Sequence, residues 1–213
     1  MIGNFGKPRT FGILLFPEVD AIDCCGPFDI FANARLNEET RRESESPIRV
    51  VLINENRDPV TAAGGLRLLP DVDFASCPPL DVLFVPGGYG TRALMSNTRY
   101  LDFVRRQAAI VERIASVSTG SLILGAAGLL VGLSATTHWR ARDLFREKFP
   151  STTLERDLRV VIDGQIMTSS SVYAGMEMSL MLVAQYYGEE VARNIALHIE
   201  CSYPETNGKR RPN

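Results

Sequence analysis

The stretch from residue 113 to residue 130 reads RIASVSTGSLILGAAGLL. It begins with a short apolar run, turns at Ser118-Thr119-Gly120 and continues as a pattern rich in leucine, alanine and glycine. Small residues on both sides of Ser118 are what a nucleophile elbow needs, because they let the chain turn sharply enough to expose the central side chain above a sheet. The stretch therefore predicts a strand, a tight turn and a helix, with Ser118 as the candidate nucleophile.

Three other apolar runs, at residues 10–16, 48–53 and 81–88, resemble the one that precedes Ser118. Short, nearly continuous apolar runs are typical of strands that are buried on both faces of a parallel sheet. Helical patterns lie between them, one expected to begin at Gly26-Pro27 and another capped by Asn97. The alternation predicts an α/β fold with an open, doubly wound, mostly parallel sheet.

Two segments interrupt this alternation. Residues 59–71 and 158–170 have the pattern of β-hairpins, and we expect them to be small excursions from the sheet. Two further helices are expected over residues 173–188 and 189–200. No repeat or low-complexity linker divides the chain, so residues 1–213 are predicted to form one domain, with a core at about 10–200 and a polar tail at 201–213.

Charge, apolar stretches and motifs in the sequence limit which partners and cofactors are expected. A formal net charge of -2 gives no global field that favours nucleic acid or an anionic membrane, and no apolar stretch reaches the roughly 20 residues of a membrane span. We therefore expect a cytoplasmic protein without membrane or nucleic-acid partners in this chain. No glycine-rich phosphate loop or metal-ligand cluster is found, so neither a cofactor nor a metal is expected. Reduced thiols are expected at the four cysteines, Cys24, Cys25, Cys77 and Cys201.

Three turns follow apolar runs and carry unusual residues: Pro17–Pro27, Pro86–Gly88 and Ser118–Gly120. Ligands of open α/β sheets bind beyond the carboxyl ends of the strands, where the strand order reverses. We therefore expect these three turns to form the site.

Asp23 has two interpretations. It is either a helix-start carboxylate or a buried carboxyl whose raised pKa lets it transfer a proton, and Asp20 and Asp29 compete with it for that role. The Gly87-Gly88 pair is either a plain tight turn or a source of a backbone N–H that faces the ligand.

The chain has two histidines, His138 and His198, so serine-histidine catalysis would have to use one of them. His138 follows a short apolar run and suits a helix cap as readily as a base. His198 lies in a helical pattern and is expected to be a packing or surface residue.

Four segments together resemble the DJ-1/PfpI superfamily, from about Phe11 to about Glu200: FPEVDAIDCCGPFDIF (16–31), CPPLDVLFVPGG (77–88), VSTGSLILGAAGLL (117–130) and ATTHW (135–139). Within the superfamily they resemble the branch that contains isocyanide hydratases and the sensor domains of AraC-type regulators. The resemblance implies a flavodoxin-like sheet sandwiched by helices, a homodimer and a small-molecule ligand.

The resemblance places Asp23 on the family's acidic partner, Gly88 on its backbone donor, Ser118 on its reactive cysteine and Thr119 on the residue after it. It implies hydration of an isocyanide to an N-substituted formamide, in which Asp23 supplies and recovers protons and the Gly88 and Thr119 backbone groups hold the intermediate. A serine hydroxyl is a far weaker nucleophile than a cysteine thiolate, so we expect this activity to be lost or much reduced.

The remaining substrate contacts are expected from Gly87, Tyr173 and His138. Tyr173 belongs to SSSVYAGMEM (169–178), where relatives have a glycine-rich turn, and Cys24-Cys25 also departs from their pattern. An engineered serine would explain only Ser118, so these departures favour natural divergence.

Two other functions stay open: a small-molecule sensor related to AraC-type regulators, and a hydrolase that uses Ser118. Cys24 and Cys25 are expected to be buried and inert.

Overall fold

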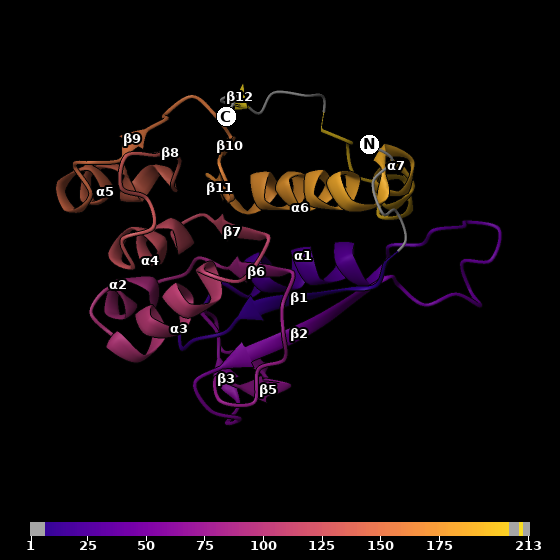
Figure 1. Cartoon of the computed structure of the whole chain (residues 1–213), viewed down its shortest axis with the longest axis horizontal. Coiled ribbons are helices and arrows are strands. Elements are labelled where there is room, and N and C mark those ends of the chain that lie inside the picture. The colour runs from indigo at the N-terminus through magenta and orange to yellow at the C-terminus, as the bar shows by residue number, and fades with distance from the viewer. Residues whose placement is uncertain (1–6, 205–208, 211–213) are drawn as a thin grey trace.

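A computed structural model describes residues 7–204 and 209–210 (Figure 1). Its main sheet has eight strands in the order β12-β10-β11-β7-β6-β1-β2-β5. In chain order these strands are β1 (Arg9–Leu14), β2 (Ile48–Asn54), β5 (Val72–Asp73), β6 (Val82–Val85), β7 (Arg113–Val117), β10 (Val160–Asp163), β11 (Ile166–Ser169) and β12 (Lys209–Arg210). All neighbours in this sheet are parallel except β10 and β11.

The order of the strands reverses beside β1. From β1 the chain passes to β2 on one side, and it later returns to place β6 on the other side. The sheet is therefore doubly wound, and the carboxyl ends of β1, β6 and β7 lie next to one another at the switch point.

Helices cover both sides of the sheet. They are α1 (Ala21–Ala32), α2 (Thr91–Leu94), α3 (Thr98–Ala108), α4 (Gly120–Ala126), α5 (Arg142–Lys148), α6 (Val172–Tyr187) and α7 (Glu189–His198). α1, α6 and α7 pack together on one side, while α2, α3 and α4 form a second group that contacts β6 and β7 (Figure 1). This is the flavodoxin-like α/β architecture that the sequence predicts.

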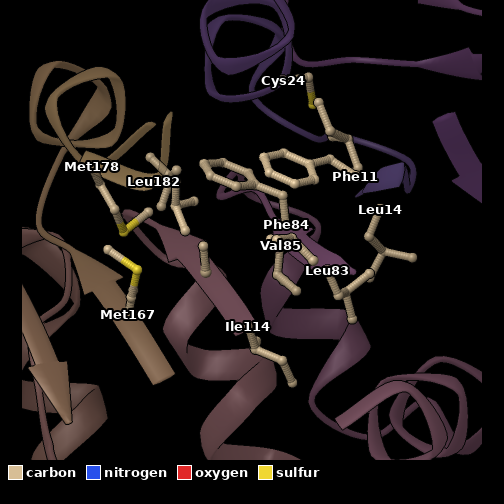
Figure 2. Packing of buried hydrophobic residues seen from close by; sticks show 14 of the residues in the cluster. Phe11, Leu14, Cys24, Leu83, Phe84, Val85, Ile114, Met167, Met178 and Leu182 are labelled. Carbon is tan, nitrogen blue, oxygen red and sulfur yellow. The ribbon is translucent and has the colours of Figure 1, made fainter. Parts of the chain in front are cut away.

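One part of the core lies between the sheet and the α1–α6 pair, and another part lies under α3 and α4. Phe11 from β1 and Phe84 from β6 extend into the first part beside Met178 and Leu182 of α6 (Figure 2), and all four side chains are buried. Strand β6 is buried at every residue, which explains its uninterrupted apolar run.

The first helix begins earlier than expected. It starts at Ala21 rather than at Gly26-Pro27, so Pro27 lies inside α1. Proline has no N–H, and the carbonyl left without that i+4 donor is Asp23, in the first turn. The helix continues through Pro27, while Asn97 caps α3 as predicted by accepting the Arg99 N–H at 3.1 Å.

One predicted hairpin is a small excursion, and the other is not. β3 (Val60–Thr61) and β4 (Arg67–Leu68) form a separate two-stranded sheet. β10 and β11 do form an antiparallel hairpin, but β11 also pairs with β7, so this hairpin extends the main sheet. All four residues of β11 are buried, which favours its inclusion in the sheet.

β8 (Ser134–Ala135) and β9 (Thr153–Leu154) form another separate pair. Part of the expected polar tail pairs with the main sheet as β12, whereas residues 205–208 and 211–213 of that tail lie outside the described residues. Within residues 7–204 and 209–210, no helix is long and apolar enough to cross a membrane.

Candidate active site

Hydrogen bonds join the three turns at the carboxyl ends of β1, β6 and β7. The Gly87 N–H donates to the Asp23 Oδ2 at 3.0 Å, which ties the second turn to the first. The Gly88 N–H donates to the Thr119 Oγ1 at 3.0 Å, which ties it to the third. The turns that the sequence singles out therefore meet at one point.

Ser118 occupies a strained backbone conformation. Its φ is 54°, in the left-handed region, which costs a non-glycine residue about 1–3 kcal/mol. The Ser118 N–H donates to the Ser169 carbonyl at 2.8 Å, and the Ser118 carbonyl accepts from the Ser121 and Thr137 hydroxyls at 3.2 and 3.3 Å. These bonds on both sides of the residue hold the elbow in the shape that the motif predicts.

Gly87 lets Asp23 and Ser118 approach each other. A β-carbon at Gly87 would lie 2.6 Å from the Asp23 Oδ2 and 2.9 Å from the Ser118 Cβ. Any side chain at this position would push one of the two away. Asp23 and Ser118 therefore flank the same small volume, as the resemblance implies.

The Asp23 carboxyl is almost fully buried, with 1% of its surface exposed. Its Oδ2 accepts the Gly87 N–H, and its Oδ1 has no hydrogen-bond partner among the described residues. Burial and, to a smaller extent, the nearby Asp20 charge raise the pKa of Asp23, the Gly87 N–H lowers it, and the net result is a pKa of about 7. A carboxyl with this pKa can both give and take a proton near neutral pH.

The buried Asp23 should make the stability of the chain depend on pH. Its pKa is about 7 in the folded chain, against about 3.9 when unfolded. Between these two pH values the folded chain therefore keeps a proton on Asp23 that the unfolded chain has lost, and this difference stabilises the folded state. The stabilisation is complete below about pH 4 and is lost as the pH rises through 7. Between pH 5.5 and 7.5 the loss should be about 2 kcal/mol.

Urea unfolding of the unchanged chain and of Asp23→Asn at these two pH values measures this loss. The variant cannot titrate at this position, so it should gain about 2 kcal/mol relative to the unchanged chain on going to pH 7.5. Parallel pH dependences in the two proteins would rule out the raised pKa.

Of the two backbone donors expected at this site, Gly88 and Thr119, one is already occupied. The Gly88 N–H is already bonded to the Thr119 Oγ1, and the Gly87 N–H is bonded to Asp23. The Thr119 N–H makes no hydrogen bond among the described residues, and it lies 2.9 Å from the position of a β-carbon at Gly87. It is therefore a backbone donor next to Ser118 that has no partner among the described residues.

A cavity of about 160 Å³ opens over the elbow. Four residues that the sequence singles out for the site line it: Gly88, Ser118, Thr119 and His138. Asp20 lines it as well. Asp23, Gly87 and Tyr173 are not part of this lining, and Tyr173 instead lies beside the Arg159 guanidinium at 5.8 Å.

Neither histidine is aligned on Ser118. His138 caps a short 3-10 helix, where its Nδ1 accepts the Arg140 N–H at 3.4 Å. Burial and the Arg140 charge lower the pKa of His138, and no hydrogen bond joins it to the Ser118 hydroxyl in the described part of the chain. His198 lies exposed at the end of α7, as expected for a surface residue. A serine-histidine pair is therefore not assembled.

The two adjacent cysteines have different environments. Cys24 is buried, and burial together with the Asp23 charge raises the pKa of its thiol well above the ordinary value. Cys25 is exposed, so the expectation that both are buried is wrong for it, because successive residues of a helix point in different directions. Among the described residues, no group of three or more histidine, cysteine or acidic side chains is arranged to hold a metal ion.

Sequence reasoning missed four residues of the cavity: Ala63, Tyr89, Arg92 and Arg140. Three of them lie within four positions of Gly88 or His138, and that proximity is the signal that could have found them. Ala63 carries no such signal. It reaches the site because its N–H donates to the Val19 carbonyl at 2.8 Å, which folds the β3–β4 hairpin over the first turn.

A model of the DJ-1/PfpI family matches residues 10–185, which include all three turns of the site. The chain belongs to the DJ-1/PfpI family. It is 40% identical to an isonitrile hydratase of Pseudomonas putida over 189 residues, which cover 89% of this chain and 77% of that enzyme. The resemblance of the sequence to the isocyanide hydratase branch is thus confirmed.

Two other comparisons support the family assignment. A crystal structure of a ThiJ/PfpI family protein from Pseudomonas syringae superposes with a TM-score of 0.80 at 33% identity, over 95% of this chain and 78% of that protein. The transcriptional regulator GbdR of Pseudomonas aeruginosa is 33% identical over 137 residues, which cover 64% of this chain and 37% of the regulator. The chain therefore spans about a third of the regulator's length.

Proposed function

We propose that this DJ-1/PfpI protein has the scaffold of an isocyanide hydratase, with an activity that Ser118 greatly reduces. The observation that carries the proposal is the placement of Asp23 and Ser118 on either side of Gly87, at a strained elbow. The 40% identity to an isonitrile hydratase supports the choice of reaction.

In the proposed reaction, the oxygen or sulfur of residue 118 gives up its proton and bonds to the isocyanide carbon, which takes up a proton. Water then adds: its oxygen bonds to the same carbon and one of its protons goes to the nitrogen. The bond to residue 118 breaks, the added hydroxyl loses its proton to the departing oxygen or sulfur, and an N-substituted formamide is formed. Asp23, with a pKa of about 7, is suited to supply and recover these protons. The Thr119 N–H is placed to stabilise charge on the bound intermediate.

Ser118 lacks what a serine nucleophile needs. A hydroxyl requires a general base aligned on it, and the Ser118 hydroxyl makes no hydrogen bond to Asp23 or His138 in the part of the chain that the structure describes. This geometry also disfavours a serine hydrolase. The proposal is tested by incubating the chain and its Ser118→Cys variant with n-butyl isocyanide and measuring N-butylformamide.

A second candidate function is a small-molecule sensor. The sequence similarity to GbdR favours it, since that regulator is 33% identical to this chain over 137 residues. A sensor binds its ligand without consuming it. A ligand that raises the melting temperature of the chain and is recovered unchanged, together with an inactive Ser118→Cys variant, would favour this function over the hydratase scaffold.

We also propose that the chain forms a homodimer through α1 and the start of α6. Ile22 and Phe28 on α1 and Tyr173 on α6 are large apolar residues with 50%, 38% and 47% of their surface exposed, and the two helices pack against each other. Large apolar side chains that are exposed on two packed helices are candidates for a protein interface.

Light scattering should therefore give about twice the chain mass of 23.5 kDa. Ile22→Glu should shift the protein to the monomer, because a carboxylate would be buried without a partner at the interface. The matched control is Val131→Glu, at an apolar residue that is 69% exposed and lies outside both helices. A monomeric unchanged chain would contradict the proposal, as would a dimer that Ile22→Glu leaves intact.

A further inference from the structure

The cavity over Ser118 carries two arginines that the hydration chemistry does not use. Arg92, in α2, and Arg140, beside His138, both line it. Neither forms an ion pair with a carboxylate anywhere in residues 7–204 and 209–210, although several other arginines of the chain do. Two positive charges therefore face one small cavity, and neither lies within ion-pair distance of a carboxylate of the described residues.

Aromatic rings hold these two guanidinium groups. Arg92 lies over the Tyr89 ring at 5.8 Å from the centroid, and Arg140 lies over the Trp139 ring at 4.8 Å. A ring face attracts a cation without neutralising it, so both groups are positioned but keep their charge. Guanidinium is also weakly hydrated and matches the two oxygens of a carboxylate.

The other charged residues of the lining indicate which net charge a ligand of this cavity would carry. Asp20 contributes one negative charge to the cavity, and His138 is held towards its neutral form by burial and by the Arg140 charge. With Arg92 and Arg140 the lining carries a net charge of about one positive unit at neutral pH. A ligand with a single negative charge would neutralise it.

We propose that the ligand of this cavity is a small organic molecule with one carboxylate, which pairs with Arg92 and Arg140 while its opposite end lies at Ser118. The placement of the other end of the ligand at Ser118 rests on the proposed function. A substrate would then be an isocyanide that bears a carboxylate. The cavity volume of about 160 Å³ restricts the ligand to a few heavy atoms besides its carboxylate and its isocyanide group.

Calorimetric titration with sodium butyrate and with butyramide tests the charge requirement on the whole chain. Butyrate should bind at least tenfold more tightly than butyramide, which has nearly the same shape without the charge. Arg92→Gln and Arg140→Gln should each raise the Kd for butyrate at least tenfold. Asp20→Asn should lower it, and this change removes no helix cap, because the Asp20 side chain makes no capping hydrogen bond.

The matched control is Arg106→Gln, at an exposed arginine of α3 that does not line this cavity. It should leave the Kd for butyrate within twofold of that of the unchanged chain. Equal binding of butyrate and butyramide would overturn the proposal, as would no binding of butyrate, or Kd values that Arg92→Gln and Arg140→Gln do not change.

Turnover separates this inference from the proposed function. The Ser118→Cys variant should have a KM at least tenfold lower for isocyanoacetate than for its methyl ester, and Arg92→Gln in that background should remove the difference. Equal KM values would overturn the carboxylate ligand and leave the hydratase scaffold standing. No turnover of either compound, together with selective binding of butyrate, would overturn the scaffold and leave the carboxylate site.

Discussion

The Ser118→Cys variant is expected to convert n-butyl isocyanide to N-butylformamide at least about 100-fold faster than the unchanged chain, a difference of roughly 2.7 kcal/mol in activation free energy. We attribute this rate difference to the change of nucleophile from oxygen to sulfur alone. A cysteine thiol has a pKa of about 8.5, so a useful fraction is thiolate near neutral pH, and sulfur needs no aligned base. The elbow at Ser118, the buried Asp23 and the Thr119 N–H are already in place.

The measurement is the initial rate of formamide formation at a fixed isocyanide concentration near pH 7.5. Ser118→Ala is the control, because it removes the hydroxyl without adding a nucleophile, and its rate should match that of the unchanged chain. Two results would contradict the argument. One is an unchanged chain that is already as fast as Ser118→Cys, and the other is a large loss of rate in Ser118→Ala, since both would show that the hydroxyl is an active nucleophile.

The parts of the fold that the sequence predicts are those decided by neighbouring residues. The apolar runs that become β6 and most of β1 and β7 are buried on both faces of the sheet, so the pattern of each run reports its burial. In β2 the pattern is weaker, because Arg49 is exposed and Val50 and Leu52 are half-buried. The predicted start of α1 was wrong because proline is usually found in the first turn of a helix, whereas this helix already begins at Ala21 and contains Pro27. The place of the β10–β11 hairpin depends on a pairing with β7 some 50 residues away in sequence, which no local pattern reveals.

In the candidate site, too, local sequence predicts some features, and others depend on distant parts of the chain. Ser118 and Gly87 could be found because an elbow and a tight turn need small residues at fixed positions. The hydrogen bond from the Gly88 N–H to the Thr119 Oγ1 could not be found, since it joins two turns that are 31 residues apart. Arg92 and Arg140 are marked only by their closeness in sequence to Gly88 and His138, and their meeting over one cavity depends on the whole fold.

Gly120→Ala is expected to destabilise the chain by at least about 3 kcal/mol. A β-carbon at Gly120 would lie 2.2 Å from the Val85 carbonyl oxygen and 2.7 Å from the Pro86 carbonyl oxygen. Both contacts are with backbone at the end of β6, which is paired with β7 on one side and β1 on the other. The clash therefore cannot be relieved by a side-chain rotation, and either the start of α4 or the end of β6 must move.

Gly26→Ala is the matched control for this substitution. Gly26 lies inside α1, and a β-carbon there would meet the Met176 Cγ at 3.3 Å, the middle of a flexible side chain that can shift. Alanine also favours the helix by up to about 1 kcal/mol over glycine, so this variant should be as stable as the unchanged chain or slightly more stable.

Urea unfolding of the three proteins measures both effects, and for a chain of this size the loss in Gly120→Ala corresponds to a fall in Tm of roughly 10 °C. The displacement should also be felt at Ser118, two residues before Gly120 in the same turn. In the Ser118→Cys background, Gly120→Ala should therefore reduce formamide formation even at a temperature where the protein remains folded, because the nucleophile would no longer be held beside Asp23. Unchanged stability in Gly120→Ala would show that α4 can separate from β6 at little cost, and the close packing that positions the elbow would then not be the reason for a glycine at this position.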